Sequence, residues 1–302
     1  MTKEQMKKEI LRLKKEKGAV ILVHNYQIGE IQDLADFLGD SLGLSREASR
    51  ISEKLIVFCG VTFMAETAKI LSPDKKVLLP RKDAECPMAE MVNVEDLKKL
   101  KAKHPDAVVV TYVNSTAEVK AESDVCCTSA NAVKIVQNID AEEIIFTPDR
   151  NLASYVQRFT KKKIIPWEGF CYVHNQFTRE EVIRAKEAHP RALLMVHPEC
   201  QPEVIDLADK VLSTSGMVRV ARESSDSEFL VGTEGGMLYR LKKENPGKNF
   251  YSAGTAKFCR GMKATRLEDL YKALLEEQYE IILPEDIINK ARMALERMLT
   301  YV

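Results

Sequence analysis

Three apolar segments that each end in polar residues recur along this chain: AVILVHNY at residues 19–26, AVVVTYVN at 107–114 and ALLMVHPE at 192–199. Each segment is short and apolar and alternates with helical patterns, which is typical of a buried strand in a parallel sheet. Further apolar strands and amphipathic helices follow each segment in the same order. The sequence therefore predicts a threefold internal repeat built from strand-helix-strand units.

The repeat also predicts how the chain divides into domains. A chain of 302 residues is long enough for two or three domains. We expect residues 1–87, 88–173 and 174–263 to form three homologous three-layer α/β/α domains with parallel sheets around a pseudo-threefold axis. The helical patterns over 264–302 should pack on the first of these domains.

Charge and hydropathy argue against several classes of function. Lys and Arg together number 45, as do Asp and Glu, so the formal net charge is zero. No basic block favours binding to nucleic acid or to an anionic membrane. No apolar run approaches the ~20 residues of a membrane-spanning helix. The charged N-terminal sequence lacks the apolar segment of a secretory signal, so we expect a cytoplasmic protein.

Three of the seven cysteines, Cys86, Cys171 and Cys259, occupy equivalent positions in the three repeats, and all three lie in predicted loops. In a protein expected to be cytoplasmic, such thiols indicate metal binding or catalysis more than disulfides. Three thiolates leave one coordination position open, which is typical of a catalytic metal. Soft thiolate ligands favour zinc or an iron–sulfur cluster, and the spacing does not distinguish the two.

Polar residues stand in pairs where the first predicted strand of each repeat ends. The pairs are His24 and Tyr26, Tyr112 and Asn114, and His197 and Glu199. Ligands of parallel sheets bind at the carboxyl ends of strands, and residues i and i+2 of a strand lie on the same side. We therefore expect the six side chains to face one cavity, where Tyr, His and Glu are capable of proton transfer.

Hydroxyl residues recur where the second predicted strand of each repeat leads into a helix: Ser41, Ser129 and Thr214, with Ser215 beside the last. A hydroxyl beside the free N–H groups of a helix N-terminus suits a carboxylate or a phosphate. The alternative is that each hydroxyl merely caps its helix. Recurrence in step with the cysteines favours the ligand site.

These motifs resemble those of the quinolinate synthase family over essentially the whole chain. The resemblance is carried by VHNYQ (23–27), GDSLGLS (39–45), CPMAEM (86–91), TYVNS (111–115), SDVCCTSANA (123–132), PDRNL (148–152), WEGFCYVH (167–174), MVHPEC (195–200), STSGM (213–217), GTEGGMLYRL (232–241) and CRGMKATRL (259–267). It implies three related α/β/α domains with a 4Fe–4S cluster at their junction. Three cysteines, corresponding to Cys86, Cys171 and Cys259, would hold the cluster and leave one iron open to substrate.

The resemblance also implies an activity, the condensation of iminoaspartate with dihydroxyacetone phosphate to quinolinate, phosphate and two waters. This reaction belongs to NAD biosynthesis, and the open iron would act in it as a Lewis acid. The residues expected to be catalytic are Tyr26, Glu199, His24, His197 and Tyr112. The residues expected to bind substrate are His24, Ser41, Tyr112, Asn114, Ser129, His197, Glu199, Thr214 and Ser215. A transient contact with the enzyme that produces iminoaspartate is a further expectation.

Two alternatives stay open on the sequence alone. The same three thiolates could hold zinc or a single iron in a lyase. The protein could instead be an iron–sulfur carrier without catalytic activity, but a carrier needs no ring of Tyr, His, Glu and hydroxyl groups. The iron and sulfide content of the anaerobic protein would separate the metal alternatives.

Overall fold

The computed structural model describes residues 1–301, whose strands form three separate four-stranded sheets. The first sheet contains β1 (Ala19–His24), β2 (Phe37–Gly39), β3 (Leu55–Cys59) and β4 (Lys76–Leu78). The second contains β5 (Val108–Tyr112), β6 (Val125–Cys127), β7 (Glu143–Thr147) and β8 (Lys163–Pro166). The third contains β9 (Leu193–Val196), β10 (Lys210–Val211), β11 (Glu228–Gly232) and β12 (Asn249–Ser252).

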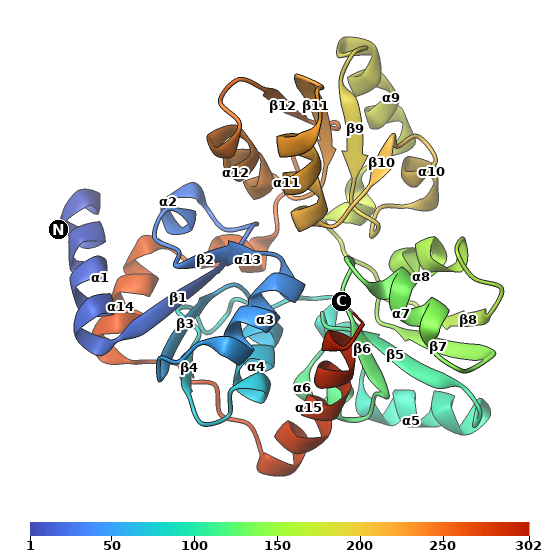
Figure 1. The fold of residues 1–302 in the computed structure, drawn as a ribbon, viewed down its shortest axis with the longest axis horizontal. Coiled ribbons are helices and arrows are strands. Elements are labelled where there is room, and N and C mark those ends of the chain that lie inside the picture. The colour runs from blue at the N-terminus through green and yellow to red at the C-terminus, as the bar shows by residue number, and fades with distance from the viewer. Residues whose placement is uncertain (302) are drawn as a thin grey trace.

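Every pairing between these strands is parallel, and the three sheets share one strand order: β2-β1-β3-β4, β6-β5-β7-β8 and β10-β9-β11-β12. Figure 1 shows the three sheets in separate lobes, each flanked by helices. The prediction of an α/β protein with parallel sheets is therefore confirmed. The strands are short and almost wholly apolar because both faces of each sheet are covered.

The helices occur in the same order relative to the strands in each repeat. The first repeat has α1 (Lys3–Lys17), α2 (Gly29–Gln32), α3 (Ser41–Arg50) and α4 (Thr62–Leu71). The second has α5 (Val94–Lys103), α6 (Ala117–Ala121), α7 (Ala132–Asn138) and α8 (Arg150–Gln157). The third has α9 (Arg179–Ala188), α10 (Pro202–Ile205), α11 (Thr214–Glu223) and α12 (Gly236–Glu244), and α13 (Arg260–Ala264), α14 (Leu267–Glu276) and α15 (Glu285–Leu299) follow.

An aspartate clamp recurs at the start of the edge strand in all three sheets. The clamps join Asp36 Oδ2 to Ile21 N at 2.8 Å, Asp124 Oδ2 to Val109 N at 2.7 Å, and Asp209 Oδ2 to Leu194 N at 2.8 Å. In each pair the backbone N–H of the aspartate also donates to the carbonyl of the strand residue. These reciprocal bonds set the register between the edge strand and the central strand beside it.

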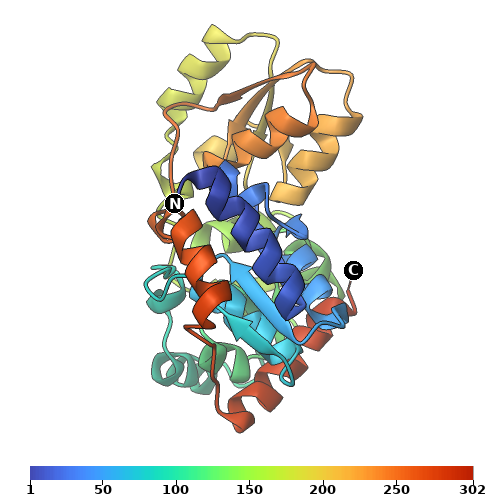
Figure 2. The same cartoon turned by 90° about the vertical axis from the view of Figure 1, so that its left-hand side faces the viewer.

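The C-terminal helices do not all pack where the sequence led us to expect. Helix α14 lies against α1, as Figure 2 shows, and its apolar face joins the cluster around Ile10 and Leu13. Helix α15 instead lies against α6 and β6 of the second repeat as well as α4 of the first. Its Leu295 and Met298 belong to a hydrophobic cluster that runs through both repeats. The tail therefore joins the first two repeats.

Within residues 1–301, no helix is both long enough and apolar enough to cross a bilayer.

Candidate active site

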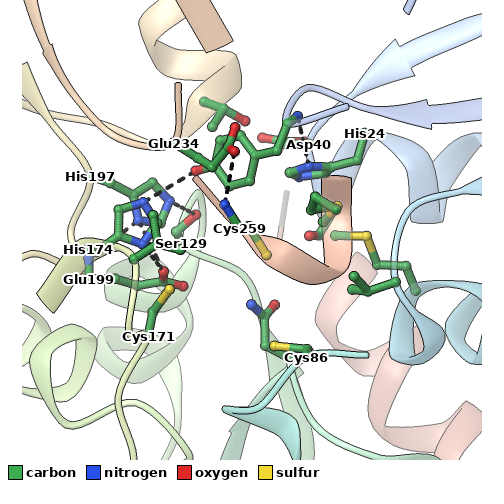
Figure 3. Close-up of a pocket in the computed structure, with 18 of the residues that line it drawn as sticks. His24, Asp40, Cys86, Ser129, Cys171, His174, His197, Glu199, Glu234 and Cys259 are labelled. Carbon is green, nitrogen blue, oxygen red and sulfur yellow. Dashed lines mark hydrogen bonds and ion pairs between the residues drawn. The ribbon is translucent and has the colours of Figure 1, made fainter. Parts of the chain in front are cut away.

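One cavity receives side chains from all three repeats where the carboxyl ends of their strands meet (Figure 3). The predicted residues that line it are His24, Tyr26, Ser41, Cys86, Tyr112, Asn114, Ser129, Cys171, His197, Glu199, Thr214 and Cys259. The structure thus brings together all the predicted site residues except Ser215. Ser215 is exposed on α11 and faces a neighbouring surface depression that includes Phe37 and Arg240. One turn of α11 directs Thr214 inward and Ser215 outward.

The polar pairs are arranged by turns rather than by strand alternation. His24 is the last residue of β1, and Tyr26 lies in the turn that follows. Its backbone N–H donates to His24 Nδ1 at 3.2 Å, and Glu199 N donates to His197 Nδ1 at 3.4 Å in the third repeat. The same turn therefore positions both pairs, and it leaves Nε2 of each imidazole to carry the hydrogen.

Both of these histidines are buried as neutral imidazoles. Burial and the charge of Lys263 lower the pKa of His24 to about 3. Burial and the neighbouring His174 lower the pKa of His197 to about 3. The Nε2 atom of His197 lies 3.2 Å from Ser129 Oγ. At neutral pH both side chains can accept or donate a hydrogen bond without carrying a charge.

A chain of one ion-pair contact and two hydrogen bonds joins Glu199 of the third repeat to Tyr26 of the first. The Oε2 atom of Glu199 lies 2.5 Å from His174 Nδ1, and His174 Nε2 lies 2.9 Å from Thr233 Oγ1. The Thr233 hydroxyl is in turn 2.6 Å from the Tyr26 hydroxyl, which is itself 3.4 Å from His174 Nε2. This carboxylate–imidazole–hydroxyl–phenol order can pass a proton between two sides of the cavity.

Burial and neighbouring groups determine which of these side chains carry a charge. Burial opposes ionisation of Glu199, but His174, whose Nδ1 faces the carboxylate, holds the pKa of the carboxyl below its usual value. Burial and the negative Glu199 raise the pKa values of Tyr26 and Tyr112. Glu199 is therefore ionised and the two phenols keep their protons, so the negative charge of this chain of residues lies on the carboxylate.

The hydroxyls do not serve as helix caps, so the capping alternative is wrong for Ser41 and Thr214. Each is the first residue of its helix, and the residue before it is the cap. Asp40 Oδ1 accepts from Gly43 N at 2.8 Å at the start of α3, and Ser213 caps α11 in the same way. The Ser41 and Thr214 hydroxyls therefore stand beside N–H groups at a helix N-terminus, inside the cavity.

The three cysteines fit a metal centre by the chemistry of their surroundings. All three are free thiols, and Figure 3 shows Cys86, Cys171 and Cys259 around a common space. Burial raises the pKa of Cys86 to about 12 and raises those of Cys171 and Cys259. Nearby backbone N–H groups, such as those of Met88 and Ala89 beside Cys86, oppose the rise. All three cysteines are half-buried, and a bound metal would supply the positive charge that favours their thiolate form.

A smaller set of possible ligands overlaps this group. One ligand atom each of Cys171, His174 and Glu199 lies within 4.8 Å of the other two. These three side chains could hold a single ion, but Cys86 and Cys259 stand outside that set. The arrangement of all three sulfurs around the cavity suits a cofactor that is larger than a single ion and that contacts a cysteine from every repeat.

Several residues of the cavity were not singled out by the sequence. His174, Asp40 and Glu234 line it, and Thr233 connects its proton-transfer chain. His174 falls within the motif WEGFCYVH, and a polar residue so close to Cys171 was a usable signal. Thr233 and Glu234 follow the third strand of their repeat, a position whose importance emerges only when the repeats are compared in space.

Fold and cavity together define a triplicated α/β protein in which each repeat contributes a free thiol, a polar pair and a hydroxyl to one buried site. The family model described as quinolinate synthetase A protein matches residues 8–300. A quinolinate synthase of Thermodesulfovibrio yellowstonii is 58% identical over 295 residues, 97% of each chain. Those of Pyrococcus furiosus and Methanoregula boonei are 56% identical over 298 residues, 98% of each chain, and 55% identical over 294 residues, 97% of each chain. The chain belongs to the quinolinate synthase family.

Proposed function

We propose that this protein is a quinolinate synthase that condenses iminoaspartate with dihydroxyacetone phosphate and releases quinolinate, phosphate and two waters. One observation carries the proposal: three thiols, three polar pairs and three hydroxyls from separate repeats line a single cavity in a chain of this family. A carrier protein would need the thiols but not the acid–base chain from Glu199 to Tyr26.

The proposed cofactor is a 4Fe–4S cluster held by Cys86, Cys171 and Cys259. Three free, half-buried thiols, one from each repeat, line the same cavity and suit such a group. When bound, the cluster would supply a Lewis acid through the iron that no cysteine holds.

The chain's own residues divide the remaining work. Glu199 accepts a proton and, through His174 and Thr233, shares it with the Tyr26 hydroxyl during isomerisation, dehydration and ring closure. His24, His197, Tyr112 and Asn114 orient intermediates by hydrogen bonds. The hydroxyls of Ser41, Ser129 and Thr214 hold the carboxylates or the phosphate. Ser215 was assigned to this set, but its exposed position outside the cavity gives the assignment no support.

The wider organisation is part of the same proposal. Residues 1–87, 88–173 and 174–263 would be three homologous domains related by a pseudo-threefold axis, which the common strand order supports. Iminoaspartate would arrive through transient contact with the enzyme that makes it. The cytoplasmic location inferred from the sequence stays a prediction.

The test is to purify the protein anaerobically, measure iron and acid-labile sulfide, and assay quinolinate from the two substrates. We expect iron and sulfide in equal amounts and quinolinate formation. Zinc, or iron without sulfide, would instead support a single ion such as Cys171, His174 and Glu199 could hold. A full cluster without quinolinate formation would reduce the protein to a carrier.

A further inference from the structure

Two buried carboxylates hold the backbone of two of the proposed cluster ligands. Asp149 Oδ2 accepts a hydrogen bond from Cys171 N at 2.9 Å, and Glu234 Oε1 accepts one from Cys259 N at 3.0 Å. Both side chains are fully buried. Figure 3 shows the bond between Glu234 and Cys259. Neither carboxylate belongs to the acid–base chain described above.

The two carboxylates are structural equivalents in their repeats. Asp149 stands two residues beyond the end of β7, and Glu234 stands two residues beyond the end of β11. Each forms an isolated parallel bridge to the loop that leads to its cysteine, Asp149 with Gly169 and Glu234 with Lys257. The same position in both repeats therefore connects the end of the third strand to the cysteine loop.

The second oxygen of each carboxylate is also used. Asp149 Oδ1 accepts from Leu152 N at 2.7 Å and so caps α8. Glu234 Oε2 accepts from Gly236 N at 2.6 Å, at the start of α12. Each carboxylate thus ties the cysteine loop to the helix that begins immediately after the strand. Both oxygens of each carboxylate therefore accept a backbone hydrogen bond.

Glu234 forms an ion pair with Lys263, and the nearby backbone leaves space for the two side chains. Lys263 Nζ lies 2.8 Å from Glu234 Oε1. A Cβ atom at Gly236 would stand 2.6 Å from Lys263 Nζ and 2.8 Å from Glu234 Oε2, so only glycine leaves room for the pair. Burial and the charge of Glu199 raise the pKa of Asp149, and backbone N–H groups oppose that rise. Burial likewise raises the pKa of Glu234, and Lys263 opposes that rise.

The first repeat lacks this device. Val61 occupies the equivalent position two residues beyond β3, and its side chain cannot accept a hydrogen bond. The loop before Cys86 is held by Thr62, whose backbone N–H and hydroxyl donate to Ala84 O at 2.9 and 3.2 Å. The loops that carry the three cysteines are therefore held in two different ways. Buried carboxyl groups hold two of them, and Thr62 holds the third.

We propose that Asp149 and Glu234 are positioning residues that hold Cys171 and Cys259 for the metal cluster. The inference rests on the proposed function because it takes these cysteines as the ligands. A cysteine N–H that donates to a side-chain carboxyl oxygen is not available to donate to a metal-bound sulfur. Fewer hydrogen bonds to the sulfurs would lower the reduction potential of a bound cluster, which suits a group that acts as a Lewis acid without changing oxidation state.

The test compares Asp149→Asn and Glu234→Gln with Asp124→Asn as the matched control. Each substitution at the site keeps the volume but turns an amide N–H₂ toward a backbone donor. Asn still caps a helix well, so Asp149→Asn separates the cysteine bond from the cap. Asp124→Asn removes a carboxylate–backbone bond in the same repeat as Asp149, in the clamp outside the cavity.

The first measurement is the rate of iron release to a chelator by the anaerobic holoenzyme. We expect release about 10- to 100-fold faster in both site variants, the usual effect of losing a residue that supports a metal ligand. The cluster midpoint potential should rise in Glu234→Gln, and Asp124→Asn should match the wild type in both readouts. Unchanged release in both site variants, or equal acceleration in the control, would overturn the proposal.

The second measurement needs no cluster and so separates this proposal from the proposed function. Alkylation of the cluster-free full chain, followed by peptide mass spectrometry, reports the exposure of each thiol. Asp149→Asn should speed modification of Cys171, Glu234→Gln that of Cys259, and neither that of Cys86. Uniform acceleration at all three would show general loosening and refute the positioning role. A wild type without a cluster would refute the proposed function while this labelling still decides the inference.

Discussion

Side chains support the sheets of the three repeats in two places. The support at the start of the edge strand is the same in every repeat, whereas the support beyond the third strand differs among the repeats. Where the edge strand begins, Asp36, Asp124 and Asp209 make the same reciprocal clamp in every repeat. Beyond the third strand, at the cavity, the equivalent residues are Val61, Asp149 and Glu234. The clamps serve the fold, which each repeat needs equally. The cavity is shared, so each repeat contributes a different part to it.

The largest effect should come from the cysteines, which the three repeats contribute alike to the cavity. Cys86→Ser, Cys171→Ser and Cys259→Ser should each abolish the 4Fe–4S cluster, because a hydroxyl replaces a soft thiolate ligand. Iron and sulfide analysis of anaerobic protein measures this. Cys126→Ala is the control, since Cys126 is buried in β6 away from the cavity. A cluster that survives in Cys171→Ser would contradict the ligand assignment.

The next largest effect should come from residues that the repeats do not share. Tyr26→Phe and Glu199→Gln should lower turnover by about two to four decades, the usual contribution of one positioned acid–base group. Their iron content should equal that of the wild type, because neither is a proposed ligand. Quinolinate formation per iron is the measurement. Near-normal turnover in both variants would leave His24 and His197 as the proton carriers.

A smaller effect is expected from the hydroxyls that recur at the cavity. Ser41→Ala, Ser129→Ala and Thr214→Ala should each weaken binding of a quinolinate-like dicarboxylate by roughly 1.5–3 kcal/mol, the contribution of a hydrogen bond to a charged group. Calorimetry on the holoenzyme measures the affinity. Ser215→Ala provides a matched control, since its side chain lies outside the cavity. Equal affinities in all four variants would remove the hydroxyls from the binding site.

The smallest effect on function should come from the clamps. Asp124→Asn should lower the free energy of unfolding by about 1 kcal/mol, because a neutral amide carbonyl is a weaker acceptor for the buried Val109 N–H than a carboxylate is. Dicarboxylate affinity and turnover should stay at the wild-type level. Urea unfolding of the cluster-free chain gives the stability. Asp36→Asn and Asp209→Asn should behave alike, and a large loss of turnover in all three would show that the clamps also shape the cavity.

Much of this molecule could be predicted from short-range patterns. Apolar runs and turns predicted the parallel strands, and the equivalent positions of Cys86, Cys171 and Cys259 predicted that the three repeats meet at one site. The polar pairs were placed correctly at the strand ends, although turns rather than alternation orient their second members. These features are local, since each repeat positions its own residues by its own strands and turns.

No short-range sequence pattern predicted the contacts between repeats. The chain from Glu199 through His174 and Thr233 to Tyr26 joins residues far apart in the sequence. The inward Thr214 and outward Ser215, and the position of α15 against the second repeat, likewise depend on how the units dock. The sequence by itself determined what each repeat brings to the centre. Tertiary structure decided which groups touch there, because hydrogen bonds across a junction depend on the docking of whole domains.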